Sequence, residues 1–344
     1  MMTTIDIDPN VLAFHEEIVI FDGLTSSPIT AEQAERMQQG GLTGANMTAS
    51  WVDADFQTAA QAIAKVRRDI KMQNDKVLVA TTVAEIVAAK QAGRTAIVIG
   101  FQNGKPVEDE IDFLDVLFHM GLRIMQLTYN EKNYIGDGCT ELRDGGLSRF
   151  GVDLIHRMAE IGVVVDLSHC SEQTCLDAIN ASSVPVIISH ANPSALIPNP
   201  RNKSDKTLEA LAERGGVVGA CAWSPLLARD PHHRPTLEDL LDSIDYLVAL
   251  LGIDHVGIGT DMGEGTYVKA IWDALYLHNG EHSQVTRMLG NWWQFETRFP
   301  EEVSSVVNLP HITAGLVRRG YNEQQIKQLW GLNFLRVFEQ VWGA

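Results

Sequence analysis

Short runs of apolar and β-branched residues recur along the chain, and polar stretches separate them. Eight such runs stand out: "IVIFDG" from residue 18, "LTGANMT" from 42, "TAIVIGF" from 95, "LRIMQLTYN" from 122, "VVVDLSH" from 163, "PVIISH" from 185, "GVVGACAW" from 216 and "HVGIGTD" from 255. Each run is almost continuously apolar rather than alternating, which is typical of strands covered on both faces. The intervening stretches indicate helices, for example 31–40, 82–93, 150–162 and 204–216, the last with Ser204 as its N-cap.

Strand and helix alternate throughout, and eight parallel strands with intervening helices close a (β/α)₈ barrel, the TIM-barrel architecture. The constant rhythm leaves no obvious linker, so we expect residues 1–344 to form a single barrel domain. A stretch at about 265–311 interrupts the rhythm after the eighth strand and is expected to roof the site or to pack on a partner subunit. A helical stripe of apolar residues predicts a C-terminal helix at about 322–342.

Charge and composition limit the classes of binding partner that we expect. The formal net charge of −17 argues against a nucleic-acid partner, because there is no basic excess to displace phosphate counterions. The first residues lack the basic and apolar regions of a signal peptide, and no run of 18 apolar residues follows, so we expect no membrane partner. The four cysteines contain no C-x-x-C pair and are expected to be free thiols, which favours a cytoplasmic location.

Candidate chemistry lies at the strand ends, because the carboxyl ends of barrel strands converge on one mouth. The residues that end the eight runs are Asp22, Asn46, Gln102 with Asn103, Tyr129 with Asn130, His169, His190, Trp223 and Asp261. No glycine-rich nucleotide motif and no G-x-S-x-G nucleophile elbow occurs in the chain.

Two neighbouring strands end alike, in "DLSH" and "ISH", which places His169 and His190 side by side. Paired imidazoles suit a first-row metal such as zinc, although a histidine at a strand end can also be a hydrogen-bonded structural residue. Asp261 could complete that metal site, act as a general base on water, or cap the following helix. Arg201, in "NPRNKSD", could hold a carboxylate bidentately or lie in a solvated loop.

The remaining histidines lie in polar stretches without partners at ligand spacing. We expect them to be surface residues: His232, His233, His278 and His282 among them.

Several ordered motifs carry a resemblance to a known family: "DG" at the first strand, "LTYN" at the fourth, then "DGGLSRFG", "VDLSH", "ISH", "PRNKSD", "GIGTD" and "GLNFLRVF". Over nearly its whole length the chain resembles the membrane dipeptidase (renal dipeptidase-like) family of the amidohydrolase superfamily, whose members are zinc-dependent (β/α)₈ barrels that cleave dipeptides. The resemblance implies that His169 and His190 bind the second zinc, that Arg201 holds the substrate carboxylate and that Asp261 is the acid/base. It also implies a homodimer, and it places Tyr129 where the family has the histidine that supports the oxyanion.

The sequence departs from that family at the metal positions. The family's Asp-Gly-His-Asn-Asp reads Asp22-Gly23-Leu24-Thr25-Ser26, the bridging glutamate is Gln102, and the "Asp-Phe-Asp-Gly" after the eighth strand becomes 261–264 "DMGE". Leucine cannot ligate a metal, serine does so poorly and an amide is a weaker ligand than a carboxylate. We therefore expect the first zinc site to be absent, and the second to hold one divalent ion or none.

Three hypotheses follow. The first is a dipeptidase-like hydrolase for a dipeptide or small N-substituted amino acid, in which one metal activates water, Asp261 shuttles the proton and Tyr129 donates to the oxyanion. Arg201 would anchor a substrate carboxylate, with Asn130, Gln102 and Asp22 as further contacts. The second is a metal-independent lyase or isomerase that uses Tyr129 and Asp261, and the third is a non-catalytic ligand-binding barrel.

Overall fold

A closed barrel of parallel strands forms the centre of the protein. The computed structural model describes residues 6–277 and 280–343. The strands hydrogen-bond in the order β1-β2-β4-β5-β6-β7-β8-β9, all in parallel. Their bounds are β1 Phe21–Thr25, β2 Gly44–Thr48, β4 Thr95–Phe101, β5 Leu122–Gln126, β6 Val164–Asp166, β7 Ile187–Ile188, β8 Val217–Ala220 and β9 Val256–Ile258. A bridge between Thr25 and Met262 and the bond from Asp261 N to Leu24 O join the chain after β9 to β1, so all eight expected runs contribute to one (β/α)₈ barrel.

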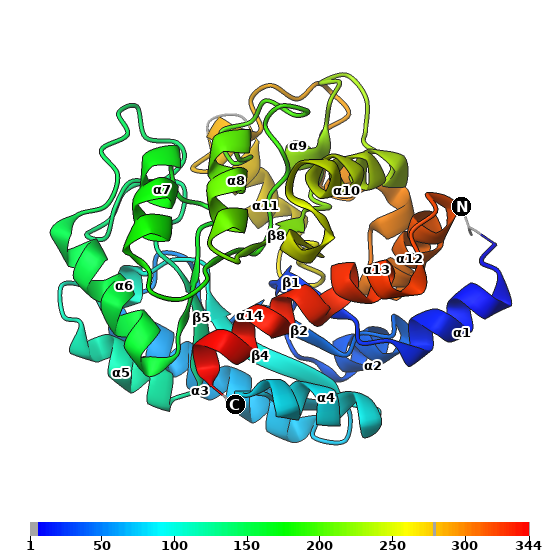
Figure 1. Ribbon diagram of the computed structural model, residues 1–344, viewed down its shortest axis with the longest axis horizontal. Coiled ribbons are helices and arrows are strands. Elements are labelled where there is room, and N and C mark those ends of the chain that lie inside the picture. The colour runs from blue at the N-terminus through cyan, green and yellow to red at the C-terminus, as the bar shows by residue number, and fades with distance from the viewer. Residues whose placement is uncertain (1–5, 278–279, 344) are drawn as a thin grey trace.

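Helices surround the barrel (Figure 1). The main helices that connect successive strands are α2 Ala31–Gln39, α3 Phe56–Met72, α4 Val83–Gln91, α5 Asp112–His119, α6 Arg149–Ile161, α7 Glu172–Ala181, α8 Asp205–Glu213 and α10 Leu237–Leu251. The others are α1 Pro9–Glu17, α9 Ser224–Leu227, α11 Lys269–Tyr276, α12 Leu309–Arg318, α13 Glu323–Lys327 and α14 Asn333–Trp342. The Ser204 side chain accepts the bond from Thr207 N at the start of α8, which confirms the expected N-cap.

Alternate residues of the strands face two separate apolar cores. In β4, for example, Ile97 and Ile99 belong to the core beneath the helices, whereas Ala96 and Val98 belong to the core inside the barrel. Both faces of each strand are therefore apolar, which explains the continuous hydrophobic runs in the sequence.

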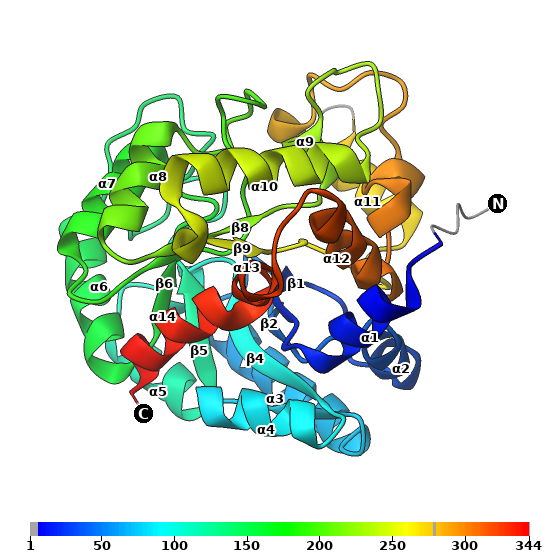
Figure 2. The ribbon, with the colours of Figure 1, turned by 45° about the vertical axis from the view of Figure 1, so that its right-hand side comes forward.

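The C-terminal helix closes the amino-terminal end of the barrel and lies across the strands in both views (Figures 1 and 2). Phe334 and Phe338 of α14 pack on Phe21, the first residue of β1, with ring centroids 6.1 and 5.3 Å from it. A side chain at Gly257 in β9 would collide with Phe334, whose ring atoms lie from 2.5 Å of the added carbon. This end of the barrel is thus filled, and the carboxyl ends of the strands remain for chemistry.

Two elements differ from the expectation. A short extra strand, β3 Val77–Val79, pairs with the first half of β4, outside the closed barrel. The expected helix at 322–342 is interrupted: α13 is followed by a π-helical segment, Gln328–Leu332, before α14 begins. The break lies at Gly331, where the backbone leaves helical geometry and where an added side-chain carbon would be 3.0 Å from Cβ of Phe21.

Candidate active site

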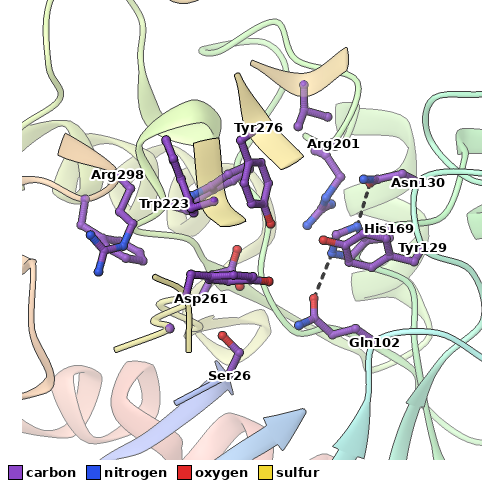
Figure 3. Close-up of a pocket in the computed structure, with 15 residues that line it drawn as sticks. Ser26, Gln102, Tyr129, Asn130, His169, Arg201, Trp223, Asp261, Tyr276 and Arg298 are labelled. Carbon is purple, nitrogen blue, oxygen red and sulfur yellow. Dashed lines mark hydrogen bonds between the residues drawn. The ribbon is translucent and has the colours of Figure 1, made fainter. Parts of the chain in front are cut away.

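A small cavity of about 50 Å³ lies at the carboxyl ends of the strands (Figure 3). It collects side chains that follow seven different strands, β1 and β4 to β9, as barrel mouths do. The sequence-expected residues that line it are Gln102, Tyr129, Asn130, His169, Arg201, Trp223 and Asp261.

The two histidines face each other through their Nε2 atoms, which are 3.2 Å apart. His169 lies between two amides: its Nδ1 is 2.8 Å from Oδ1 of Asn130, and its Nε2 is 3.1 Å from Oε1 of Gln102. The neutral tautomer that donates from Nδ1 to Asn130 leaves a lone pair on Nε2. Burial, together with the positive charge of Arg201, holds the pKa of both imidazoles well below the usual range. Both side chains are therefore neutral, the form that binds metals.

A hydrogen bond between Nδ1 and Ser189 fixes the position of the proton on the His190 ring. Asp166, at the end of β6, is fully buried and accepts bonds from the hydroxyls of Ser168 and Ser189. Because the Ser189 hydroxyl donates to this carboxylate, its oxygen accepts from Nδ1 of His190 at 2.8 Å. The Nε2 atom of His190 thus also carries a lone pair, directed at His169. The sequence analysis missed these supporting residues, although a serine before each histidine in "DLSH" and "ISH" is the signal that could have identified them.

Arg201 is buried rather than solvated, and it lies next to the histidine pair. Its guanidinium donates to the backbone oxygens of Ser168 and His190. Lys203, also buried, donates to the backbone oxygen of Cys170 at 2.7 Å. A guanidinium has five donors, so Arg201 retains N–H groups for a ligand in the cavity that it lines.

Asp261 is partly buried at the cavity wall, and its backbone adopts the left-handed region with φ of 60°. Asn130, which orients His169, shares this rare conformation with φ of 56°, so two cavity residues carry local backbone strain. Burial raises the pKa of the Asp261 carboxyl to about 7, against an opposing effect of Arg201. Such a group exchanges a proton readily near neutral pH.

Tyr129 stacks on His169, with ring centroids 4.0 Å apart and planes inclined by 23°. Burial raises the pKa of its phenol well above the usual value, and the neighbouring Tyr267 and Asp261 raise it further. The hydroxyl therefore stays protonated and can act as a hydrogen-bond donor.

Asp22 lies away from the cavity and is not among the residues that line it. Its carboxylate accepts from Thr260 N and Oγ1 at 2.8 and 2.5 Å and from Leu24 N at 3.2 Å, which fastens β1 to β9. The structure thus gives Asp22 a role in closing the barrel instead of the expected substrate contact. Leu24 is buried in the core, whereas Ser26 does reach the cavity.

The residues present fit one metal ion better than two. Two imidazole ligands of a tetrahedral zinc ion, each at about 2.0–2.1 Å, lie about 3.3 Å from each other, close to the separation seen for His169 and His190. Within residues 6–277 and 280–343, no group of three or more His, Cys, Asp or Glu side chains is placed to hold a metal. Asp261 therefore does not complete a three-ligand site, and the amide of Gln102 is the remaining oxygen beside the histidines.

The segment at about 265–311 roofs the cavity, one of its two expected positions. Tyr267, Trp272 and Tyr276 line it from α11 and the turn before this helix, together with Val285, Arg298 and Phe299. These aromatic residues were not identified from the sequence. His282 was expected on the surface but is buried, with its ring 5.2 Å from that of Tyr129. His232 and His233 are exposed as expected, and His278 lies outside the described residues.

The protein is a (β/α)₈ barrel with polar side chains gathered at its mouth, and sequence comparison gives the family. Residues 13–279 and 289–343 match the family described as membrane dipeptidase (peptidase family M19). The chain belongs to this family, which confirms the resemblance found in the motifs.

Comparisons with individual proteins support the same family assignment. An amidohydrolase from Pseudomonas aeruginosa superposes with a TM-score of 0.89 at 34% identity, over 97% of this chain and 99% of that one. A metallo peptidase from Rhodobacter sphaeroides, solved with a phosphinate mimic of the dipeptide L-Ala-D-Ala, shares the fold with a TM-score of 0.76 at 19% identity, over 94% and 99% of the two chains. The dipeptidase tcpJ of Claviceps purpurea (strain 20.1) is 25% identical over 84% of this chain, and the match spans 61% of tcpJ.

In the described part of the chain, no helix is both long enough and apolar enough to cross a membrane.

Proposed function

We propose that this chain hydrolyses the amide bond of a dipeptide or a small N-substituted amino acid, with one divalent ion held by His169 and His190 and with Asp261 as the acid/base. The observation that carries the proposal is the approach of the two Nε2 atoms to 3.2 Å, in imidazoles whose Nδ1 atoms contact Asn130 and Ser189. With the Nδ1 protons donated to these partners, both Nε2 atoms present lone pairs. Lone pairs that face each other without a proton between them repel, and a cation removes that repulsion. A bound divalent ion would act as a Lewis acid toward water and the substrate carbonyl.

The other cavity residues have separate tasks. Asp261, with its pKa raised by burial to about 7, takes the proton of the attacking water and returns it to the leaving nitrogen. Tyr129, protonated and stacked on His169, donates to the carbonyl oxygen as it gains negative charge. The free N–H groups of Arg201 hold the substrate carboxylate, while Asn130 fixes His169 and Gln102 adds a neutral oxygen next to it.

Membership of the family and the dipeptidases among its relatives support this reaction class. The dipeptide mimic bound to the Rhodobacter sphaeroides neighbour supports a substrate of that size. Zinc as the ion, a homodimeric assembly, a single domain over residues 1–344 and a cytoplasmic location remain predictions.

One feature favours a second candidate, a metal-independent lyase or isomerase acting on a small carboxylate. Arg201 and Lys203 place two cations within reach of the histidines and lower their pKa, and the same charges would repel a metal ion. In that case Tyr129 and Asp261 serve as acid and base without a metal.

A panel of dipeptides and N-acyl amino acids tests the reaction. For the hydrolase, kcat/KM of the wild type should rise with pH and level off above an apparent pKa of about 7. The Asp261→Asn variant should lose about 10²–10⁴-fold in kcat. Turnover that releases no free amino acid, or full activity in Asp261→Asn, would exclude the proposed reaction.

A further inference from the structure

The cavity next to His169 is too small for a whole substrate of the proposed class. Its volume of about 50 Å³ gives room to a few water molecules, each of which needs about 10–15 Å³ of such space. Pockets for small organic ligands span about 300–1,000 Å³. The inner cavity can therefore enclose the reacting group but not the remainder of a dipeptide.

A second cavity of about 390 Å³ adjoins the first. Its walls are the loop after β5, from Tyr129 to Thr140, the loops after β2 and β4, and the roof segment at Glu281–Gln284. This outer cavity has the volume that the inner one lacks.

One aromatic contact separates the two cavities. Tyr129 and Asn130 line both of them. The Tyr129 ring stacks on His169 inside. It also makes a T-shaped contact with the ring of His282, which lines the outer cavity, with ring centroids 5.2 Å apart. Figure 3 shows the Tyr129 ring against His169, at the side of the inner cavity where Asn130 also lies.

We infer that the substrate spans both cavities: its reacting amide lies beside His169, and a polar, extended N-substituent of the same molecule passes Tyr129 and His282 into the outer cavity. The inference rests on the proposed function for the position of the amide. It deepens that function by assigning the substrate class, an amino acid with a long polar substituent on nitrogen.

The side chains that line the outer cavity are the reason why we expect a polar substituent on the substrate. Lys105 and Asp53 form an ion pair at 2.8 Å on its wall, and Lys132, Glu131 and Glu281 add further charges. Asn103 and Asn130 also lie on the wall, as buried amides whose oxygens contact Asn133 and His169. An alkyl chain placed there would remove water from the charged side chains of Lys132, Glu131 and Glu281 without replacing its hydrogen bonds, whereas an amide or charged substituent can pair with them.

A variant that fills the outer cavity tests the inference. Gln284 is exposed at its mouth, so Gln284→Trp narrows it, and Met288→Trp, on an exposed residue of the same segment that lines neither cavity, is the matched control. The probes are γ-glutamylalanine, with an extended polar substituent, and N-formylalanine, with a minimal one. Gln284→Trp should lower kcat/KM for γ-glutamylalanine about tenfold or more and leave N-formylalanine within about twofold of the wild type.

A widening variant should act in the opposite direction. His282→Ala removes one side of the partition and should raise kcat/KM for γ-glutamylalanine relative to N-formylalanine. Equal effects of Gln284→Trp on both compounds, or no effect on γ-glutamylalanine, would overturn the two-cavity site.

Calorimetric binding of the same compounds to an Asp261→Asn background separates this site from the reaction. If neither compound were turned over while Gln284→Trp still weakened γ-glutamylalanine binding, the proposed reaction would fail and the two-cavity site would stand. Unchanged binding in Gln284→Trp would overturn the site whatever the reaction.

Discussion

Nε2 of His169 lies 3.2 Å from Nε2 of His190, and both atoms carry lone pairs in the tautomers that donate from Nδ1. Asn130 holds the Nδ1 proton of the first imidazole, and Ser189, itself bonded to Asp166, holds that of the second. A pair of neutral imidazoles fixed in this way is prepared for a cation, as the supporting hydrogen bonds of metal-binding histidines usually are.

Ser189→Ala tests whether this support matters. The substitution removes the acceptor of the His190 Nδ1 proton, so His190 can turn or change tautomer, and the affinity for zinc should fall about 10–100-fold. Competition with a chromophoric chelator measures it. Ser183→Ala, on an exposed serine in the loop before β7, is the control and should bind as the wild type does. Equal affinity in both variants would mean that the Asp166–Ser189 contact does not tune the site.

Asp261 should make the folded protein less stable as pH rises. Its pKa is raised by burial from 3.8 to about 7, so between these values the folded state keeps a proton that the unfolded state has released. The free energy of unfolding therefore falls as pH rises from about 4 to about 7. Asp261→Asn removes this loss and should be more stable than the wild type at pH 8, on the order of 2 kcal/mol after allowance for solvent screening.

Denaturant unfolding at pH 4 and pH 8 checks this difference. The two proteins should differ far less at pH 4, where the carboxyl is largely protonated in the folded state. A wild-type advantage at pH 8 would show that the carboxylate is stabilised rather than strained by its surroundings.

Asp22 should affect stability more than substrate binding. Asp22→Ala leaves the buried N–H groups of Leu24 and Thr260 without their acceptor, which should cost about 2–4 kcal/mol of unfolding free energy. Asp22→Asn keeps one acceptor and should lose less. Chemical denaturation measures both, and KM for substrate should stay within about twofold of the wild type in Asp22→Asn. A large rise in KM at unchanged stability would instead restore the substrate contact expected from the sequence.

Tyr129→Phe removes the phenol and keeps the ring that stacks on His169. We expect kcat to fall about 10²–10³-fold, because one donor to the oxyanion is lost, with little change in thermal stability. Steady-state kinetics and a melting curve on the same preparation measure the two effects. Full kcat in this variant would assign Tyr129 to packing alone.

Much of the fold and of the cavity could be predicted from sequence, because the cavity residues lie at the ends of the strands. The eight apolar runs identified the barrel, and the convergence of their last residues brought His169, Tyr129 and Asp261 together. The direction of a buried polar side chain is set by tertiary partners, so neither the turn of Asp22 toward Thr260 nor the burial of Arg201 next to the histidines could be predicted from local sequence. The residues of the roof could not be predicted either, since Tyr276 and His282 reach the cavity from a segment without regular periodicity.

Metal stoichiometry tests the central claim most directly. Protein purified without chelators, loaded with excess zinc and then desalted should contain about one ion per chain by elemental analysis, and His190→Ala should contain none. Removal of the ion should abolish amide hydrolysis, and its return should restore it. Two ions per chain, or full activity in metal-free protein, would contradict the account.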